Sequence, residues 1–239
     1  MTPELALLVV LGTAAACTLS ASAGLGGSLI LVPLLALAIG TKEGVALAAL
    51  LLAANNVVKI VAYRRAIPWR AVLEVLIVVI VGSLLGASLL VALPEVWVSI
   101  AVVASIVLSL VAERLGVARA QRFGAPALGL ASGATSGFSG TSGPLKGLAL
   151  RMLRLDRAHL VGAASIVSLA GDATKAAVYA TGGLLQASSV VLMVGLVPVM
   201  LASTFFGRYL NKRVGERGYA VLFWVVMGGY SLRLLGLAF

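Results

Sequence analysis

The sequence predicts an all-α, polytopic membrane protein built from two repeats of inverted topology. Three observations predict this class: long apolar runs recur along the whole chain, glycine clusters interrupt two of them, and both interruptions recur in one register. Of the 239 residues, 61% are hydrophobic and 11% are charged, with a mean hydropathy of +1.12. Soluble domains average roughly 45–50% apolar and about 25% charged residues. A barrel would need alternating segments of about ten residues, and none is visible.

The apolar runs define the predicted elements, since about 18–25 residues of helix cross a hydrocarbon core of roughly 30 Å. The first repeat, 1–118, contains the segments 5–39, 43–63, 70–92 and 95–112. The second repeat, 119–239, contains the segments 124–150, 158–180, 185–207 and 218–237. The first run has some features of a signal peptide but lacks a leading Lys or Arg. Because it has a counterpart in the second half, we expect it to belong to the mature protein.

Two of these segments contain helix breaks. The stretch "GLGGS" at 24–28 interrupts the first segment of repeat one, and "SGFSGTSGP" at 136–144 interrupts the first segment of repeat two. Glycine runs followed by proline punctuate helices. Each broken segment is therefore expected to be either a re-entrant hairpin of two half-helices or a kinked full span.

The distribution of basic residues favours the hairpins. The basic loop residues are Arg64, Arg65, Arg70, Arg114, Arg119, Arg122, Arg151, Arg154, Arg157, Arg208, Lys212, Arg213 and Arg217. If both broken segments return to the side they entered from, all of these charges share one face and the opposite loops hold only Lys42. The positive-inside rule prefers this arrangement. We expect two hairpins and six full spans in a prokaryotic cell membrane, with both termini outside.

A shift of 116 residues aligns the two halves without a gap. It pairs Ser20 with Ser136, Gly24 with Gly140, Gly27 with Gly143, Lys59 with Lys175 and Tyr63 with Tyr179. Each predicted half crosses the membrane three times. Because three is odd, the halves would be inserted upside down relative to each other, a common plan of secondary transporters.

The breaks predict an anion site at membrane depth. Irregular backbone is tolerated there only where protein buries it or it lines a watery cavity. The half-helix after each break would present free N–H groups at its positive dipole end. The candidate contacts are Gly24, Gly26, Gly27, Ser28, Gly140, Thr141, Ser142 and Gly143. The alternative is that these glycines only allow close helix packing.

Lys59 and Lys175 are the second part of the predicted site. A lysine at the centre of a membrane helix costs about 2.5–3.5 kcal/mol on insertion scales, so it is a functional candidate by default. Asp172 precedes Lys175 by three residues, but its counterpart is Asn56, so Lys59 keeps an unmatched charge that suits an anion. The alternatives are that Lys59 reaches the membrane surface and that Lys175 simply pairs with Asp172.

Other polar residues complete the candidate set. Asn55 and Asn56 are expected to donate hydrogen bonds to the substrate. Asp172 either pairs with Lys175 or carries a coupling proton, and the sequence leaves both open. Lys146, near the second break, is a lesser candidate because its counterpart is Ile30. The matched tyrosines are expected to be interfacial belt residues rather than ligands.

Three stretches resemble the sulfite exporter TauE/SafE family. The stretch "GLGGSLILVPLL" at 24–35 is similar to that family's motif of a glycine triplet followed by proline, "SGFSGTSGPL" at 136–145 to its second copy, and "YRRAIPW" at 63–69 to a loop. The similarity covers the whole chain, although Ser28 and Ser142 replace glycines. The resemblance implies export of sulfite, sulfonates or related organosulfur anions, with re-entrant hairpins meeting at a central site.

Composition argues against other function classes. The net charge of +10 falls mostly in loops between apolar runs, as on the cytoplasmic side of membrane proteins, so no nucleic-acid partner is expected. Cys17 and His159 are single, so no disulfide, metal site or cofactor is predicted. The expected partners are a small anion and membrane lipid.

Two alternative functions remain from the sequence. "GFSG" at 137–140 matches the nucleophile signature of rhomboid intramembrane proteases, which would pair Ser139 with His159. Because His159 sits at the end of a span rather than at membrane depth, this enzyme is a remote alternative. A channel, or a transporter of another small anion, fits the same features.

Overall fold

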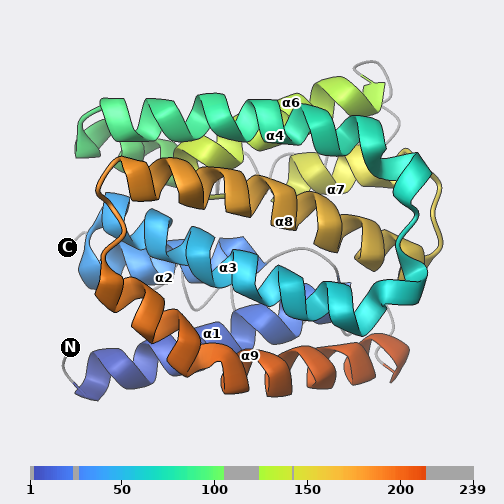
Figure 1. Cartoon of the computed structure of the whole chain (residues 1–239), viewed down its shortest axis with the longest axis horizontal. Helices are drawn as coiled ribbons and strands as arrows, with labels where there is room; N and C mark the ends of the chain where they lie inside the picture. The colour runs from blue at the N-terminus through green and yellow to red at the C-terminus, as the bar shows by residue number, and fades with distance from the viewer. Residues whose placement is uncertain (1–2, 24–26, 105–123, 142, 214–239) are drawn as a thin grey trace.

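The structure is a computed structural model that describes residues 3–23, 27–104, 124–141 and 143–213 (Figure 1). Over these residues the protein is all-helical, which confirms the predicted fold class at that level. The helices are α1 (Pro3–Ala23), α2 (Gly27–Ile39), α3 (Thr41–Tyr63), the 3-10 turn η1 (Arg64–Ala66), α4 (Trp69–Ala92), α6 (Gly124–Ser139), α7 (Gly143–Arg151), α8 (Arg157–Thr181) and α9 (Ala187–Arg213). Residues Glu95–Ala104 are also helical. The predicted segment 218–237 lies outside the described residues.

Several helices have the length and composition of membrane spans. Thr41–Ala66, Trp69–Ala92 and Ala187–Leu210 are long and apolar enough to cross a bilayer. Helix α8 is 25 residues long, which also exceeds the roughly 20 residues that a crossing needs. Large apolar side chains are exposed along α4 and α9, including Leu85 and Val191, as expected for surfaces that face lipid acyl chains. The chain is a multi-pass membrane protein.

Two pairs of consecutive antiparallel helices, α1 with α2 and α6 with α7, open toward opposite ends of the bundle (Figure 1). The α1–α2 pair opens at the left in this view, where α3 begins. The α6–α7 pair opens at the right, where α3 ends and α8 begins. Helix α6 ends at Ser139 because Gly140 adopts a left-handed backbone conformation, with φ of 76°, that terminates helices and favours glycine.

Helices α3 and α8 lie side by side in the middle of the bundle. Helix α3 also packs against α2 and α9, whereas α8 packs against α4. The α6 helix packs against α4, and α1 packs against α9. This arrangement encloses the facing sides of α3 and α8, which carry the predicted lysines.

Glycines bring α4 and α6 into backbone contact. A Cβ atom at Gly82 or Gly86 on α4 would collide with the carbonyl oxygens of Leu130 and Ala134 on α6. Gly133 on α6 would likewise collide with the backbone of α4. Small residues at such spacings let membrane helices approach closely. Close packing therefore accounts for this set of glycines, which lies largely outside the two predicted breaks.

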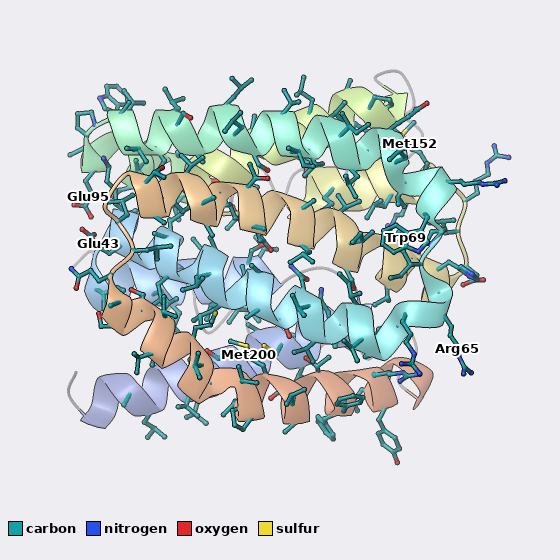
Figure 2. All side chains as sticks on the ribbon, in the orientation of Figure 1. Glu43, Arg65, Trp69, Glu95, Met152 and Met200 are labelled. Carbon is teal, nitrogen blue, oxygen red and sulfur yellow. The ribbon has the colours of Figure 1, made fainter. Side chains whose placement is uncertain are left out.

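The two ends of the bundle differ in charge. Figure 2 shows Arg65 and Trp69 at one end and Glu43 and Glu95 at the other. At the acidic end, Lys42 Nζ donates to the Val91 carbonyl oxygen at 3.1 Å. The ends of α3 and α7 and the start of α8, where the basic clusters occur, lie together at the opposite end (Figure 1).

Candidate functional site

Helices α3 and α8 carry the candidate site on their facing sides. The polar residues of each helix recur at spacings of three and four, which places them on one helix face. Lys59 on α3 and Lys175 on α8 are both 1% exposed and are among the largest fully buried side chains described. The protein therefore holds two lysines in its interior, where each needs a polar partner.

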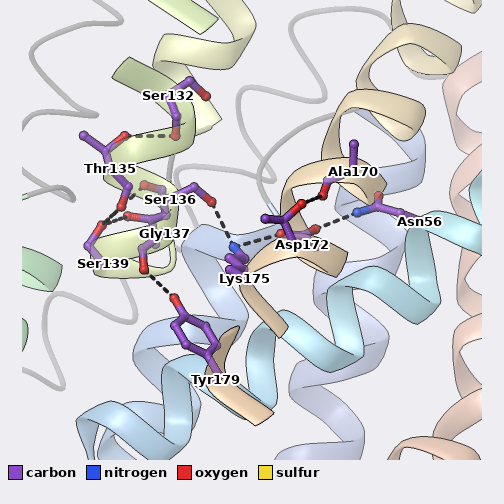
Figure 3. A network of polar contacts seen from close by, with 12 residues as sticks. Asn56, Ser132, Thr135, Ser136, Gly137, Ser139, Ala170, Asp172, Lys175 and Tyr179 are labelled. Carbon is purple, nitrogen blue, oxygen red and sulfur yellow. Dashed lines mark hydrogen bonds and ion pairs between the residues drawn. The ribbon is translucent and has the colours of Figure 1, made fainter. Parts of the chain in front are cut away.

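Lys175 has a carboxylate partner. Its Nζ lies 2.8 Å from Asp172 Oδ1 and also donates to Ser136 Oγ on α6 at 2.9 Å (Figure 3). Of the alternatives that the sequence left open, the pairing of Lys175 with Asp172 is the one observed. The ammonium charge of Lys175 is thus neutralised locally.

Lys59 has a hydroxyl partner instead. Its Nζ donates to Ser20 Oγ, in the last turn of α1, at 2.8 Å. No carboxylate lies within ion-pair distance of this ammonium among the described residues. The alternative that Lys59 reaches the membrane surface is not supported, because the side chain is buried and bonds Ser20. Its charge is unmatched by any direct ion pair that the structure describes.

The two neighbouring asparagines differ in their contacts. Asn56 Nδ2 donates to Asp172 Oδ2 at 2.7 Å, linking α3 to α8 (Figure 3). Asn55 Oδ1 accepts a 2.8 Å hydrogen bond from Thr204 Oγ1 on α9. The Asn55 Nδ2 group is buried and has no hydrogen-bond partner among the described residues. Buried donors are nearly always paired in folded proteins, so the unbonded amide nitrogen of Asn55 is a candidate donor to a ligand, whereas that of Asn56 already bonds Asp172.

The matched tyrosines anchor the first helix of each hairpin. Tyr63 Oη donates to the Ala21 carbonyl oxygen at 3.0 Å, and Tyr179 Oη donates to the Gly137 carbonyl oxygen. Both side chains are buried. The prediction of a belt of tyrosines that face lipid is therefore wrong, because both rings are buried and their hydroxyls are bonded to backbone, although Tyr63 lies at the basic end of the bundle.

Lysine and tyrosine together make a two-point contact in each half. In the first half, the lysine of α3 bonds Ser20 and the tyrosine bonds the residue after it, Ala21. In the second half, the lysine of α8 bonds Ser136 and the tyrosine bonds the residue after it, Gly137. The sequence separations are the same in both cases, 39 residues for the lysine contacts and 42 for the tyrosine contacts. Each contact therefore recurs after 116 residues, which is also the separation of Asn56 and Asp172.

The predicted break residues have more than one role. Gly27 begins α2, where a Cβ atom would lie 3.1 Å from both the Ala16 carbonyl oxygen and Ser20 Cβ. This crowding favours a packing role for Gly27. Gly140 provides the left-handed turn, and a Cβ atom there would also press against Val32.

The remaining break residues are only partly accounted for. Thr141 is buried beside Ser139, Ser28 is partly exposed, and Gly143 begins α7. The candidates Gly24, Gly26 and Ser142 lie outside the described residues. The structure thus assigns no direct anion contact to these positions.

Lys146 adds a third positive charge to the interior. It lies on α7, deep in the protein yet partly exposed, and its charge interacts with those of Lys59, Lys175 and Asp172. Among the described residues, these three lysines therefore have one nearby carboxylate, that of Asp172. Such a region attracts anions, and sequence alignment undervalued Lys146 because its counterpart is apolar.

Sequence reasoning missed the partners of these charged groups. Ser20 and Ser136 were visible as a matched pair, but their link to the lysines depends on which helices lie opposite each other. Thr204 carried no sequence signal. No group of acidic, histidine and cysteine side chains that could hold a metal ion occurs within the described residues.

The rhomboid alternative is not supported by the geometry. Ser139 Oγ donates to the Thr135 carbonyl oxygen on its own helix at 2.8 Å. His159 Nδ1 lies 2.6 Å from Asp156 Oδ2 at the exposed start of α8. The two members of the required dyad are thus each bound to other groups.

A multi-pass helical bundle that buries two lysines, one of them without an ion-pair partner among the described residues, is compatible with transport of an anion across a membrane. Residues 8–234 match the family model of the sulfite exporter TauE/SafE proteins. The chain belongs to this family, whose members are transporters of sulfur-containing anions and not enzymes. No curated protein and no solved structure gave a significant match.

Proposed function

We propose that this protein exports a small sulfur oxyanion, such as sulfite or an organosulfonate, through a central site between two inverted repeats. The observation that carries this proposal is the environment of Lys59, a fully buried ammonium whose described partner is the hydroxyl of Ser20. A buried charge without a counter-ion is unfavourable. A bound anion would supply that counter-ion.

The recurrence of contacts supports the repeat. Lysine–serine and tyrosine–carbonyl contacts recur at one spacing in residues 1–118 and 119–239. The two hairpins open toward opposite ends of the bundle, as halves inserted upside down would require (Figure 1). On this basis the hairpins are re-entrant, and the site lies where their ends approach α3 and α8.

Within the site, the polar residues divide into two roles. Lys59 and Lys146 supply positive charge, and Asn55 Nδ2 supplies a free donor for an anion oxygen. Asp172 bonds both Lys175 and Asn56, and on this basis we assign it a structural role in the site. The backbone N–H groups in the first turns of α2 and α7, which begin at Gly27 and Gly143, are the further donors that we assign to the anion.

Transport then couples anion binding to movement of a hairpin. Ser20 lies in the last turn of α1, so Lys59 ties that hairpin to α3 when no anion is bound. An anion that binds the Lys59 ammonium competes with Ser20 for it and so weakens the hydrogen bond between α3 and α1. The halves then rock about the central site and open it to the other side, as inverted-repeat transporters do. The basic end, assigned to the cytoplasm by the positive-inside rule, attracts the anion to the entry side.

The experiment is thermal unfolding of the purified protein with a panel of anions. A ligand at 100 times its Kd stabilises the folded state by about 2.7 kcal/mol. Sulfite or a sulfonate should raise the Tm of the wild type, and Lys59→Ala should abolish the rise. Lys42→Ala is the matched control, because Lys42 lies at the acidic end and donates to a backbone carbonyl. It should respond like the wild type.

Other results would change the conclusion. Stabilisation by phosphate or carboxylates alone would keep an anion site and exclude sulfur specificity. A Lys59→Ala variant that responds like the wild type would overturn the central site. To separate a carrier from a channel, reconstituted vesicles loaded with sulfite should show faster uptake of labelled sulfite than empty vesicles, because a carrier exchanges its substrate.

A further inference from the structure

A second basic feature lies away from the central site, at the end of the bundle where α3 meets α8 and α9. It is a cavity of about 560 Å³. The lining includes Tyr63, Arg64, Arg65, Ala158, Phe205 and Arg208. These residues come from the end of α3 with η1, the start of α8 and the last turns of α9. The cavity therefore joins segments that are far apart in the sequence.

The cavity contains positive charge without acidic partners. Arg64 and Arg65 are exposed, and the Arg208 guanidinium lies over the Tyr63 ring, 5.5 Å from its centroid. None of the three arginines has an ion-pair partner among the described residues, and no acidic residue lines the cavity. Guanidinium groups bind phosphate through paired hydrogen bonds. The charge and donor geometry therefore suit a phosphate group.

An apolar surface leads from this cavity along the bundle. Val61 on α3 is 58% exposed and Val57, one turn earlier, is 49% exposed. Phe205 on α9 is 48% exposed and also lines the cavity. Helix α3 lies between α8 and α9 in Figure 1 and packs against both. On membrane spans these side chains are in reach of acyl chains.

We propose that this cavity binds the phosphate headgroup of an anionic phospholipid whose acyl chains lie along α3 and α9. Basic pockets at the cytoplasmic ends of membrane helices bind such headgroups. Trp69, exposed at the same end, is the residue type found at the level of lipid headgroups. A four-atom oxyanion such as sulfite would fill only a small part of the cavity, which favours a lipid headgroup over the transported ion.

The bound lipid ties three helix ends together. Arg64 and Arg65 belong to the connection between α3 and α4, whereas Arg208 belongs to α9. Tyr63, beside the headgroup, holds the α1 backbone through its hydroxyl. We therefore expect the lipid to stabilise the packing of α3 on α9 and the position of the first hairpin.

The test measures lipid-dependent stability and lipid retention. Purified protein is heated in mixed micelles that contain phosphatidylglycerol or phosphatidylcholine, and retained lipid is counted by native mass spectrometry. Phosphatidylglycerol should raise the Tm of the wild type by several degrees more than phosphatidylcholine does. The triple variant Arg64→Gln/Arg65→Gln/Arg208→Gln should lose this difference and the retained lipid. The triple Arg→Lys variant should keep much of it, because the charges remain.

Matched controls separate this cavity from general surface charge and from the central site. Arg70→Gln removes an exposed charge at the same end, on α4 outside the cavity lining, and should keep the lipid response. Lys59→Ala should also keep it, so the outcome does not depend on the proposed transport site.

Three results would overturn the proposal. Equal stabilisation by both lipids would indicate general solvation of apolar surface. A loss with Arg70→Gln as large as with the triple variant would indicate diffuse charge attraction. Displacement of the lipid effect by millimolar glycerol phosphate or sulfite would indicate a vestibule for soluble anions.

Discussion

Asn56 on α3 donates a 2.7 Å hydrogen bond to Asp172 on α8, and the two residues occupy the same position in the two aligned halves (Figure 3). Two carboxylates at this contact would repel each other. With an amide on one side, a single carboxylate bonds both Asn56 and Lys175. The same difference leaves Lys59 without a carboxylate three residues earlier in its helix, where Lys175 has Asp172. The asymmetry that leaves Lys59 without an ion pair is thus linked to the contact that joins α3 to α8.

The Lys175–Asp172 ion pair predicts a strong, non-additive effect on stability. Lys175→Ala leaves a buried carboxylate unpaired, and removing one partner of a buried ion pair typically costs about 3–5 kcal/mol. The double variant Asp172→Asn/Lys175→Gln should be more stable than Lys175→Ala, because no buried charge is left over. Thermal unfolding of Asp172→Asn, Lys175→Gln, the double variant and the wild type measures this coupling. Additive losses would contradict it.

The serine partners predict a difference between the two lysines. Ser20→Ala removes the described hydrogen-bond partner of Lys59, whereas Lys175 keeps Asp172 when Ser136 becomes alanine. An unsatisfied buried group costs about 1–3 kcal/mol or more. Without added anion, Ser20→Ala should therefore lower the Tm more than Ser136→Ala does.

Sulfite provides the control for that comparison. A bound anion satisfies the Lys59 ammonium, so sulfite should recover more stability in Ser20→Ala than in Ser136→Ala. Equal recovery in both variants would mean that the two lysines have equivalent environments.

The backbone contact of α4 with α6 predicts that adding one methyl group at this contact lowers the stability of the protein. Gly86→Ala would push against the Ala134 carbonyl oxygen, and overpacking typically costs about 1–3 kcal/mol. Gly195→Ala on α9 is the matched control, because nothing lies within 4 Å of a Cβ atom there. The first variant should show a lower Tm and the second a Tm at or above that of the wild type. Similar losses at both positions would argue for a general effect of glycine replacement.

The start of α8 predicts a pH-dependent contribution to stability. Asp156 caps this helix, accepting from the His159 backbone N–H at 2.9 Å, and this hydrogen bond with the one to the His159 side chain lowers the Asp156 pKa from its usual 3.8. Because the folded-state pKa lies below the unfolded one, the stabilisation is present above pH 3.8 and is lost as the pH falls through the lowered pKa. Tm measurements of wild type and Asp156→Ala between pH 7 and pH 3 should converge at the acidic end.

Asp156→Asn is the control for this interpretation. Asparagine also caps helices but does not titrate in this range. Its advantage over Asp156→Ala should persist at low pH. A wild-type advantage over Asp156→Ala that is independent of pH would show that the carboxylate charge contributes nothing to the cap.

Much of the architecture could be predicted from local features of the sequence. Apolar runs determine which segments are helical spans, because their composition matches the bilayer interior. Gly140 marks a helix end because only glycine adopts its left-handed conformation easily. The pairing of Asp172 with Lys175 was also a local expectation, since residues three apart on a helix face the same way.

The contacts between helices could not be predicted in this way. Tyr63 and Tyr179 were predicted to be interfacial because each lies near the end of an apolar segment. The sequence does not show which helix packs against them, and that packing is what buries both rings. Lys146 was undervalued because its closeness to the other lysines depends on the path of α7. The unbonded state of Asn55 Nδ2 is likewise visible only in the structure, where Thr204 on α9 bonds Asn55 Oδ1 and no described group bonds the nitrogen.

The sequence by itself determined the helical membrane class, the positions of both breaks, the matched lysines and the family resemblance, because each depends on composition or spacing along one chain. Only the tertiary structure decided which lysine is neutralised, which asparagine keeps a free donor, and that three arginines surround one cavity. Helix packing brings together residues that are far apart in the sequence, such as Asn55 and Thr204, which are 149 positions apart. The free energy of a buried charge is set by these distant neighbours, so it cannot be read from the charge's own segment.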